Sequence, residues 1–188
     1  HRLGGSGTLQ ENTIQSLKDS IENSVFNHRD FRYWEFDIHE SADSKIFVFH
    51  DDEIEVDGNL HILKELKLTE IKELGKSLEI TIPTLAEVLE ILDERTEKVM
   101  IEVKNLISEE GRKKLVESVE ENKNYTLMAT PVRFEKSFPK NSREMWHSRL
   151  RESNTKLVQV RRHRVNLFAA SKSRLLWVLA KQKWLPFL

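Results

Sequence analysis

The chain has 188 residues, of which 38% are apolar and 32% charged, so it can bury a substantial core and is expected to form a single domain over residues 1–188. It contains no cysteine, which excludes disulfides, thiolate metal sites and cysteine nucleophiles. No apolar run approaches the roughly 20 residues of a membrane span. Composition leaves the compartment open, with a cytoplasmic location as the first expectation.

The net charge of −1 hides an uneven distribution. Residues 1–125 carry 16 Lys and Arg against 28 Asp and Glu, a net charge of −12. Residues 126–188 carry 14 against 3, a net charge of +11. The two halves therefore face different partners, or each other.

The chain begins with His1 and Arg2, followed by a glycine-rich segment. Its glycines let backbone amides approach a ligand closely, although a plain surface loop explains them equally well. Apolar residues at helical spacing follow from Ile14 to Val25, preceded by Asn12 and Thr13 as capping residues. Glu11 and Asn12 either order the loop or only cap the helix, and capping explains Asn12 better than it explains Glu11.

Two strands are predicted at Tyr33–Ile38 and Ile46–His50, joined by a polar link. On the first strand Glu35 and Asp37 share one face, and the opposite face is wholly apolar. An edge strand with its acids in water is the simpler interpretation. If the strand is buried, however, two like charges need a positive group between them.

A third apolar run, Val99–Lys104, again places Glu102 and Lys104 on one face. Between these strands, Pro83 and Thr84 open a helix and Ser108 caps another. Strands that alternate with helices favour a parallel sheet. In a parallel barrel, chemistry collects at the carboxyl ends of the strands, where Asp37, His50 and Lys104 are expected.

Seven spaced motifs in residues 1–104 resemble the glycerophosphodiester phosphodiesterase family. They are His1-Arg2 with glycines, Glu11-Asn12-Thr13, Glu35-x-Asp37, His50-Asp51, Asp57-Gly58, Ile82-Pro83-Thr84-Leu85 and Glu102-x-Lys104. The resemblance implies an α/β fold of the TIM (β/α)8 type and a phosphoric diester hydrolase.

The resemblance also implies roles for individual residues. Glu35, Asp37 and Glu102 match the family's metal-binding carboxylates, and an all-oxygen set suits Ca²⁺ or Mg²⁺. His1 and His50 match the two catalytic histidines that act as general acid and base. Arg2 and Lys104 would bind the substrate phosphate. The implied reaction cleaves a small glycerophosphodiester to sn-glycerol 3-phosphate and an alcohol.

The sequence departs from the family pattern in places. Leu3 stands where the family usually has glycine, and no family motif follows Asn105. Further strands are expected at Thr126–Ala129, Lys156–Val160 and Trp184–Leu188. These give about six of the eight strands that a closed barrel needs. We therefore expect an incomplete barrel that lacks the strand before His1 and the last strand or strands.

The basic end has two explanations. Arg161–Arg164 is a cationic run, and Ser171–Trp184 reads as an amphipathic helix. The helix either packs on the barrel with a solvated basic face, or contacts an anionic membrane surface weakly. The second case would favour a lysophospholipase D-type activity. Nucleic acid is not expected as a partner, because the acidic half would repel it.

A non-catalytic truncated homologue that binds phosphate headgroups is the remaining alternative, and the oligomeric state stays open.

Two smaller expectations concern residues near the site. His39 continues the inward row of Glu35 and Asp37 and could touch substrate. The acidic run from Asp52 to Asp57 is expected to be a solvated loop.

Overall fold

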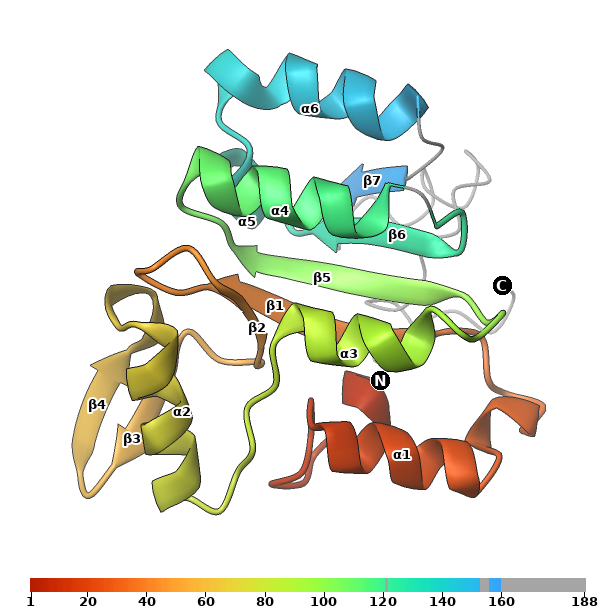
Figure 1. The fold of residues 1–188 in the computed structure, drawn as a ribbon, viewed down its shortest axis with the longest axis vertical. Coiled ribbons are helices and arrows are strands. Elements are labelled where there is room, and N and C mark those ends of the chain that lie inside the picture. The colour runs from red at the N-terminus through yellow and green to blue at the C-terminus, as the bar shows by residue number, and fades with distance from the viewer. Residues whose placement is uncertain (121, 153–155, 160–188) are drawn as a thin grey trace.

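The computed structural model describes residues 1–120, 122–152 and 156–159 and shows a mixed α/β protein built on a five-stranded sheet (Figure 1). The strand order is β2-β1-β5-β6-β7, and a separate hairpin pairs β3 with β4. The strands are β1 (Trp34–Glu40), β2 (Ile46–Val48), β3 (Glu53–Val56), β4 (Asn59–Ile62), β5 (Val99–Asn105), β6 (Tyr125–Ala129) and β7 (Lys156–Gln159). The α-helices are α1 (Ile14–Glu22), α2 (Leu68–Ser77), α3 (Leu85–Leu92), α4 (Glu109–Val119), α5 (Pro131–Ser137) and α6 (Lys140–Glu152). Short 3₁₀ turns are η1 (Arg2–Gly4), η2 (Val25–Asn27) and η3 (Leu63–Glu65).

Strands β1, β5, β6 and β7 run parallel to one another, as the alternation of strands and helices predicted. Their carboxyl ends point to the same side, on the left in Figure 1, where the β3–β4 hairpin and α2 also lie. The predicted strands at residues 126–129 and 156–160 correspond to β6 and β7. The four strands therefore deliver their last residues to one edge of the sheet.

The prediction of parallel pairing was wrong for β2. This strand is antiparallel to β1, with Ile38 opposite Val48, and it ends before His50. Only five residues join the two strands, whereas a parallel crossover needs about a dozen or more. The shortness of this link was the feature of the sequence that indicated antiparallel pairing.

The charged side chains of the run from Asp52 to Asp57 are exposed to solvent, as predicted, but the run is mostly a hairpin and not a loop. Asp57 and Gly58 form its two-residue turn, with φ angles of 51° and 74°. Two consecutive left-handed residues match the twist of a tight hairpin, which explains this Asp-Gly pair. Ile54 and Val56 are buried, while Glu53 and Glu55, which alternate with them, stay exposed.

Two hydrophobic clusters hold these elements in place. In the larger, the apolar face of β1 packs with buried residues of α3 and α4, including the fully buried stripe Leu115, Val116 and Val119. The smaller joins β2, the hairpin and α2 around Phe47. One face of the central strands is thus committed to the core, and the other is left for polar side chains.

The predicted helix caps are confirmed at three positions. Thr13, Thr84 and Ser108 each accept a hydrogen bond from a backbone N–H in the first turn of α1, α3 and α4 respectively. In α3 the Thr84 backbone N–H donates in turn to the Glu87 carboxylate at 2.6 Å, which completes a capping box. These caps fix the start of three helices that flank the sheet.

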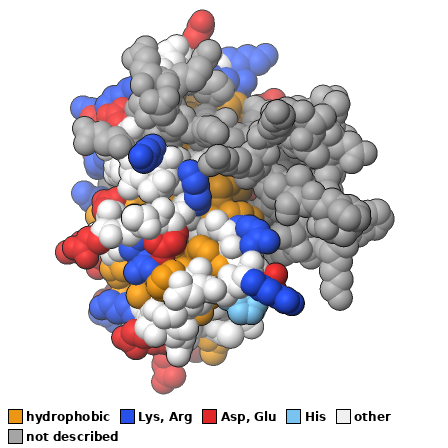
Figure 2. Space-filling view, turned by 90° about the vertical axis from the view of Figure 1, so that its right-hand side faces the viewer, with side chains coloured by type: hydrophobic (Ala, Val, Ile, Leu, Met, Phe, Trp, Pro, Cys, Tyr) orange, Lys and Arg blue, Asp and Glu red, His pale blue; other side chains and the backbone are white. Residues whose placement is uncertain are grey.

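Several predictions fall outside the described residues. They are the strand at Trp184–Leu188, the cationic run Arg161–Arg164 and the amphipathic helix Ser171–Trp184. Within the described ranges, no helix combines the length and apolar character needed to cross a membrane. Figure 2 shows basic and acidic side chains interspersed over the described part of one face.

Candidate active site

Three buried carboxylates meet on the polar face of β1 and β5. The register places Asp37 directly opposite Glu102, and Glu35 precedes Asp37 on the same face of β1. Glu35 and Asp37 are fully buried and Glu102 is 4% exposed. One oxygen from each residue lies within 4.8 Å of the others. The strand is therefore not an edge strand with its acids in water.

Lys104 supplies the positive group that the buried acids require. Its Nζ lies 2.9 Å from Asp37 Oδ1 and 2.9 Å from Glu102 Oε1. Burial opposes the charged form, but the two carboxylates outweigh it and raise the pKa of Lys104. The ammonium thus stays charged inside the cluster.

The amino-terminal turn η1 brings His1 and Arg2 to the same cluster. The Arg2 backbone N–H donates to Glu35 Oε2 at 2.9 Å, and His1 Nδ1 lies 3.6 Å from that oxygen. The Arg2 guanidinium binds the Glu11 carboxylate at 2.5 and 2.6 Å, and its Nε is 3.9 Å from Asp37 Oδ2. Glu11 therefore orders the loop rather than capping α1.

Leu3, the departure from the family's glycine, keeps a glycine-like backbone. Its φ is 56°, in the left-handed region that glycine enters without strain. Its side chain is fully buried in the larger core cluster. The side chain therefore points into the core, and η1 still approaches Glu35 through its backbone.

Asn12 supports the site rather than α1, which is the loop-ordering alternative of the two that the sequence left open. Its Nδ2 donates to Asp37 Oδ2 at 2.9 Å, and its backbone N–H donates to the Arg2 carbonyl at 2.9 Å. Its φ is 60°, a conformation that asparagine tolerates better than most residues. One side chain therefore ties the amino-terminal loop to a central carboxylate.

His50 lies at the rim, on the segment that follows β2. Its ring is 29% exposed, and its Nδ1 lies 2.6 Å from Asp51 Oδ1. The His50 carbonyl is 3.5 Å from Nε2 of His39, whose side chain is buried. Burial lowers the pKa of His39 to about 4, so this ring is neutral near pH 7. His39 therefore contacts the His50 backbone and is not exposed to solvent.

Sequence reasoning missed Arg133, which lies on α5 just after β6. Its guanidinium pairs with Asp52 through both nitrogens, at 2.9 and 2.8 Å, and donates to the Lys104 carbonyl at 2.8 Å. The available signal was its position directly after the carboxyl end of a predicted strand. Asp52 is thus part of the rim of the site and not of a free loop.

The charges of the cluster suit a divalent cation. The Lys104 ammonium contacts two of the three carboxylates, Asp37 and Glu102, and the Arg2 guanidinium is already paired with Glu11. Among the described residues, Glu102 Oε2 is buried without a hydrogen-bond partner. A buried oxygen in that state is costly unless something positive meets it. Hard oxygen donors of this kind fit Ca²⁺ or Mg²⁺.

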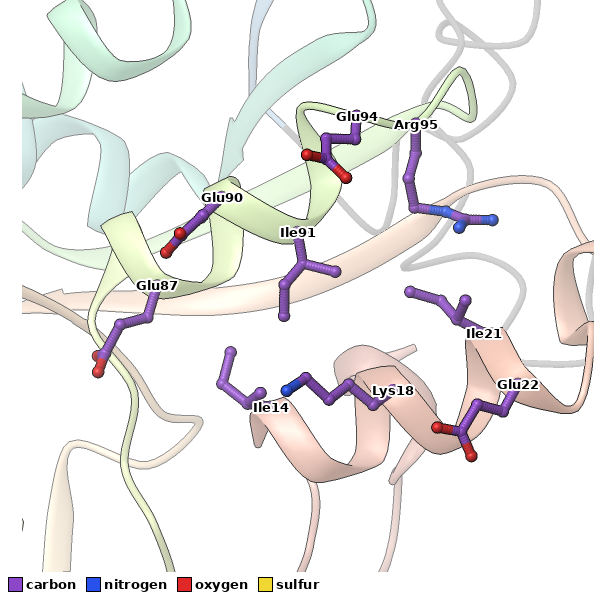
Figure 3. Close-up of a pocket in the computed structure, with 9 residues that line it drawn as sticks. All are labelled: Ile14, Lys18, Ile21, Glu22, Glu87, Glu90, Ile91, Glu94 and Arg95. Atoms are coloured by element: carbon purple, nitrogen blue, oxygen red, sulfur yellow. The ribbon is translucent and has the colours of Figure 1, made fainter.

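A large groove of about 890 Å³ lies elsewhere, between α1 and α3 (Figure 3). Ile14, Ile21 and Ile91 line it together with charged side chains such as Glu90 and Lys18. None of the three buried carboxylates contributes to its lining. The groove is therefore separate from the candidate active site.

A comparison with family models covers nearly the whole chain. The model of the glycerophosphoryl diester phosphodiesterase family matches residues 1–186. The chain belongs to this family. The family fold is a TIM barrel and its members are phosphodiesterases, which confirms the predicted enzyme class of phosphoric diester hydrolase. A comparison with curated proteins gave no match.

Solved structures show the same fold at low identity. An Oleispira antarctica phosphodiesterase in complex with the product sn-glycerol-3-phosphate is 21% identical, with a TM-score of 0.54 over 91% of this chain and 79% of that one. The glycerophosphoryl diester phosphodiesterase domain of an uncharacterised Mycobacterium tuberculosis protein is 12% identical, with a TM-score of 0.54. That match covers 90% of this chain and 62% of the mycobacterial one.

Proposed function

We propose that this protein hydrolyses glycerophosphodiesters to sn-glycerol 3-phosphate and an alcohol, in a reaction that depends on a divalent metal. The observation that carries the proposal is the buried cluster of Glu35, Asp37 and Glu102 within 4.8 Å, on the strand face that the core does not use. Membership of the family supports the choice of substrate class, and the Oleispira antarctica protein holds the corresponding product.

In this proposal Glu35, Asp37 and Glu102 hold Ca²⁺ or Mg²⁺. When bound, the cation supplies charge that offsets the negative oxygens of the phosphate. Lys104 adds a second positive group at the same place, and its contacts with Asp37 and Glu102 keep it oriented. Arg2 is the other proposed phosphate ligand. Its present partner Glu11 holds the guanidinium beside Asp37.

His1 and His50 are the proposed acid and base. One histidine takes the proton of the glycerol hydroxyl next to the phosphodiester while that oxygen bonds to phosphorus. The other gives a proton to the alcohol oxygen as its bond to phosphorus breaks. Water then opens the cyclic phosphate with the two proton transfers reversed. The 3.6 Å approach of His1 to Glu35 and the 2.6 Å contact of His50 with Asp51 support ordered rings.

The experiment is an assay with glycerophosphocholine and glycerophosphoethanolamine as substrates, with Mg²⁺, with Ca²⁺ or with a chelator. We expect release of sn-glycerol 3-phosphate with metal and its loss with the chelator. A protein that binds Ca²⁺ or Mg²⁺ yet releases no product from either diester would support the non-catalytic alternative. Turnover that persists after chelation and dialysis would remove the metal requirement.

Two candidate substrates remain to be ranked, a soluble glycerophosphodiester and the larger lysophospholipid. The family is described as acting on glycerophosphoryl diesters, and the Oleispira antarctica protein holds sn-glycerol-3-phosphate. On that basis we place the short diester first. In a direct comparison, faster release of choline from lysophosphatidylcholine than from glycerophosphocholine would reverse that order.

A further inference from the structure

The pair Arg133–Asp52 joins α5 to the segment that carries the proposed site residue His50. Arg133 stands on α5, which follows β6, and Asp52 lies two residues after His50. The guanidinium meets the carboxylate with two parallel bonds, from Nη1 at 2.9 Å and from Nη2 at 2.8 Å. A two-bond arginine–carboxylate contact fixes orientation as well as distance. The segment after His50 is thereby tied to α5.

The same guanidinium also holds the end of β5. Arg133 Nη1 donates to the Lys104 carbonyl at 2.8 Å. One side chain therefore binds both Asp52, two residues after His50, and the backbone of Lys104. Three of the five N–H donors of an arginine are engaged in these contacts. A guanidinium used in this way serves better as a brace than as a direct phosphate ligand.

His39 completes the support from the inner side. Its Nε2 lies 3.5 Å from the His50 carbonyl, its Nδ1 lies 3.9 Å from Asp52 Oδ1, and its ring stacks on Phe47 at 5.6 Å. Arg133 is the cation that bonds the Asp52 carboxylate directly, through Nη1 and Nη2. The segment 50–52 is therefore held between a buried ring and a guanidinium.

We propose that Arg133 and Asp52 form a latch that positions His50 relative to Lys104 and the buried carboxylates. This inference rests on the proposed function, because the latch matters for catalysis only if His50 is a catalytic residue. Arg133 and Asp52 are positioning residues: they act through the backbone of residues 50–52 and of Lys104. A displacement of about 1 Å at a reacting group can cost about 10²-fold in rate.

The test compares Arg133→Gln, Asp52→Asn and the double variant with wild type, using glycerophosphocholine and Mg²⁺. Each single change is expected to lower kcat by roughly 10- to 100-fold, with a much smaller effect on KM. The double variant should be no slower than the slower single variant, since either change releases the same latch. The Mg²⁺-induced rise in Tm should persist in all three, because the buried carboxylates are untouched.

Arg149→Gln is the matched control. Arg149 makes an equally well-formed pair with Glu120, with two contacts at 2.7 Å, but between α6 and the end of α4. Its removal should leave kcat unchanged. A loss of kcat in Arg149→Gln equal to that in Arg133→Gln would overturn the latch, because it would show a general loss of stability. A rise in KM alone in Arg133→Gln would also overturn it and indicate direct contact with substrate.

Hydrogen exchange provides a readout that does not need activity. Arg133→Gln and Asp52→Asn should both speed amide exchange in residues 49–53, while the β1 and β5 amides and the Arg149→Gln control stay as in wild type. If wild type proves inactive but these amides respond, the proposed function fails and the latch stands. If wild type is active and neither the amides nor kcat respond, the latch is wrong and the function stands.

Discussion

Buried charge at single residues is the basis of the proposed chemistry. Glu35, Asp37 and Glu102 are removed from water together, and Lys104 alone does not balance them. Uncompensated buried ions cost several kcal/mol each, so a cation that binds there should stabilise the folded protein by mass action.

Substitution of Glu102 tests whether a bound cation stabilises the folded protein. Glu102→Gln keeps the side-chain shape but removes one negative ligand, so the rise in Tm on adding Ca²⁺ or Mg²⁺ should shrink strongly or vanish. The measurement is a thermal melt with and without metal. Glu110→Gln is the control, because this exposed glutamate lies away from the cluster and pairs with Lys114 in an i,i+4 contact. Equal metal responses in both variants would remove Glu102 from the metal site.

The two histidines predict a pH signature. With His1 and His50 in opposite protonation roles, kcat/KM should follow a bell-shaped curve in pH, because only one combination of protonated and neutral rings is active. His50→Ala should lower kcat by about 10²-fold or more. His28→Ala, at an exposed position on η2's C-terminal side, is the control. Full activity in His50→Ala would rule out the two-histidine scheme.

Much of the site was predictable from residue spacing. Period-two alternation placed Glu35, Asp37, Glu102 and Lys104 on one face because a strand leaves no other arrangement. Spacing could not reveal Asn12 or Arg133. Their roles depend on a left-handed backbone in one case and on the packing of a helix against the strand ends in the other. Both are tertiary properties.

Among the secondary structure elements, β1 and α4 are joined by an unusual buried acid. A register shift between Ile38 and His39 precedes Glu40, which is 1% exposed and accepts from the backbone N–H groups of Ile107 and Ser108 at 2.5 and 3.0 Å. A β-carbon on Gly111 would lie 2.3 Å from the Glu40 carboxyl carbon. Because Gly111 has no side chain, the Glu40 carboxylate has room beside the first turn of α4.

This fit predicts a non-additive pair of changes. Glu40→Ala leaves two N–H groups unpaired and should cost about 1–3 kcal/mol. Gly111→Ala should destabilise wild type despite alanine's better helix propensity, but much less so in the Glu40→Ala background, where the space is open. Urea unfolding of the two single variants and the double variant measures the cycle. Additive losses would contradict the proposed packing.

The Arg133–Asp52 pair makes a pH prediction for stability. The Arg133 guanidinium holds the pKa of Asp52 below its usual range. A lowered folded-state pKa stabilises the protein above the unfolded value of about 4, and this contribution is lost as pH falls through the folded pKa. Arg133→Gln should therefore lose less stability than wild type between about pH 5 and pH 3.

Urea unfolding across that pH range is the measurement. Arg29→Gln serves as the control, since Arg29 is exposed and only 3.7 Å from the exposed Asp30. Parallel stability curves for wild type and Arg133→Gln would show that the pair contributes nothing to the acid response.

The elements also show where sequence patterns fail. Capping residues predicted the starts of α1, α3 and α4 because those signals are local. Strand direction is not local, and β2 turned back on β1 because its link is short. The charged side chains of the Asp52–Asp57 run are solvated as expected, while the two apolar side chains between them, Ile54 and Val56, pack under the hairpin and make the run a strand.

For the whole molecule, the parallel strands and the family match agree. Strands β1, β5, β6 and β7 give part of the parallel sheet expected of a TIM barrel, and the family model extends to residue 186. Barrel enzymes place their chemistry at the carboxyl ends of strands. In this structure Lys104 lies next to the end of β5, whereas Asp37 and Glu102 lie in the middle of their strands and Glu35 lies near the start of β1. The sequence motifs ended at residue 104, but the family match shows that the likeness continues beyond them.

The most direct test is phosphorus NMR of glycerophosphocholine incubated with the protein and Mg²⁺. The diester signal should decay, a cyclic glycerophosphate signal should rise and fall, and glycerol 3-phosphate should accumulate. With Glu102→Gln or with chelator, the diester should persist. A diester signal that never changes with metal-loaded wild type, or that decays equally in Glu102→Gln, would contradict a metal-dependent phosphodiesterase site at Glu35, Asp37 and Glu102.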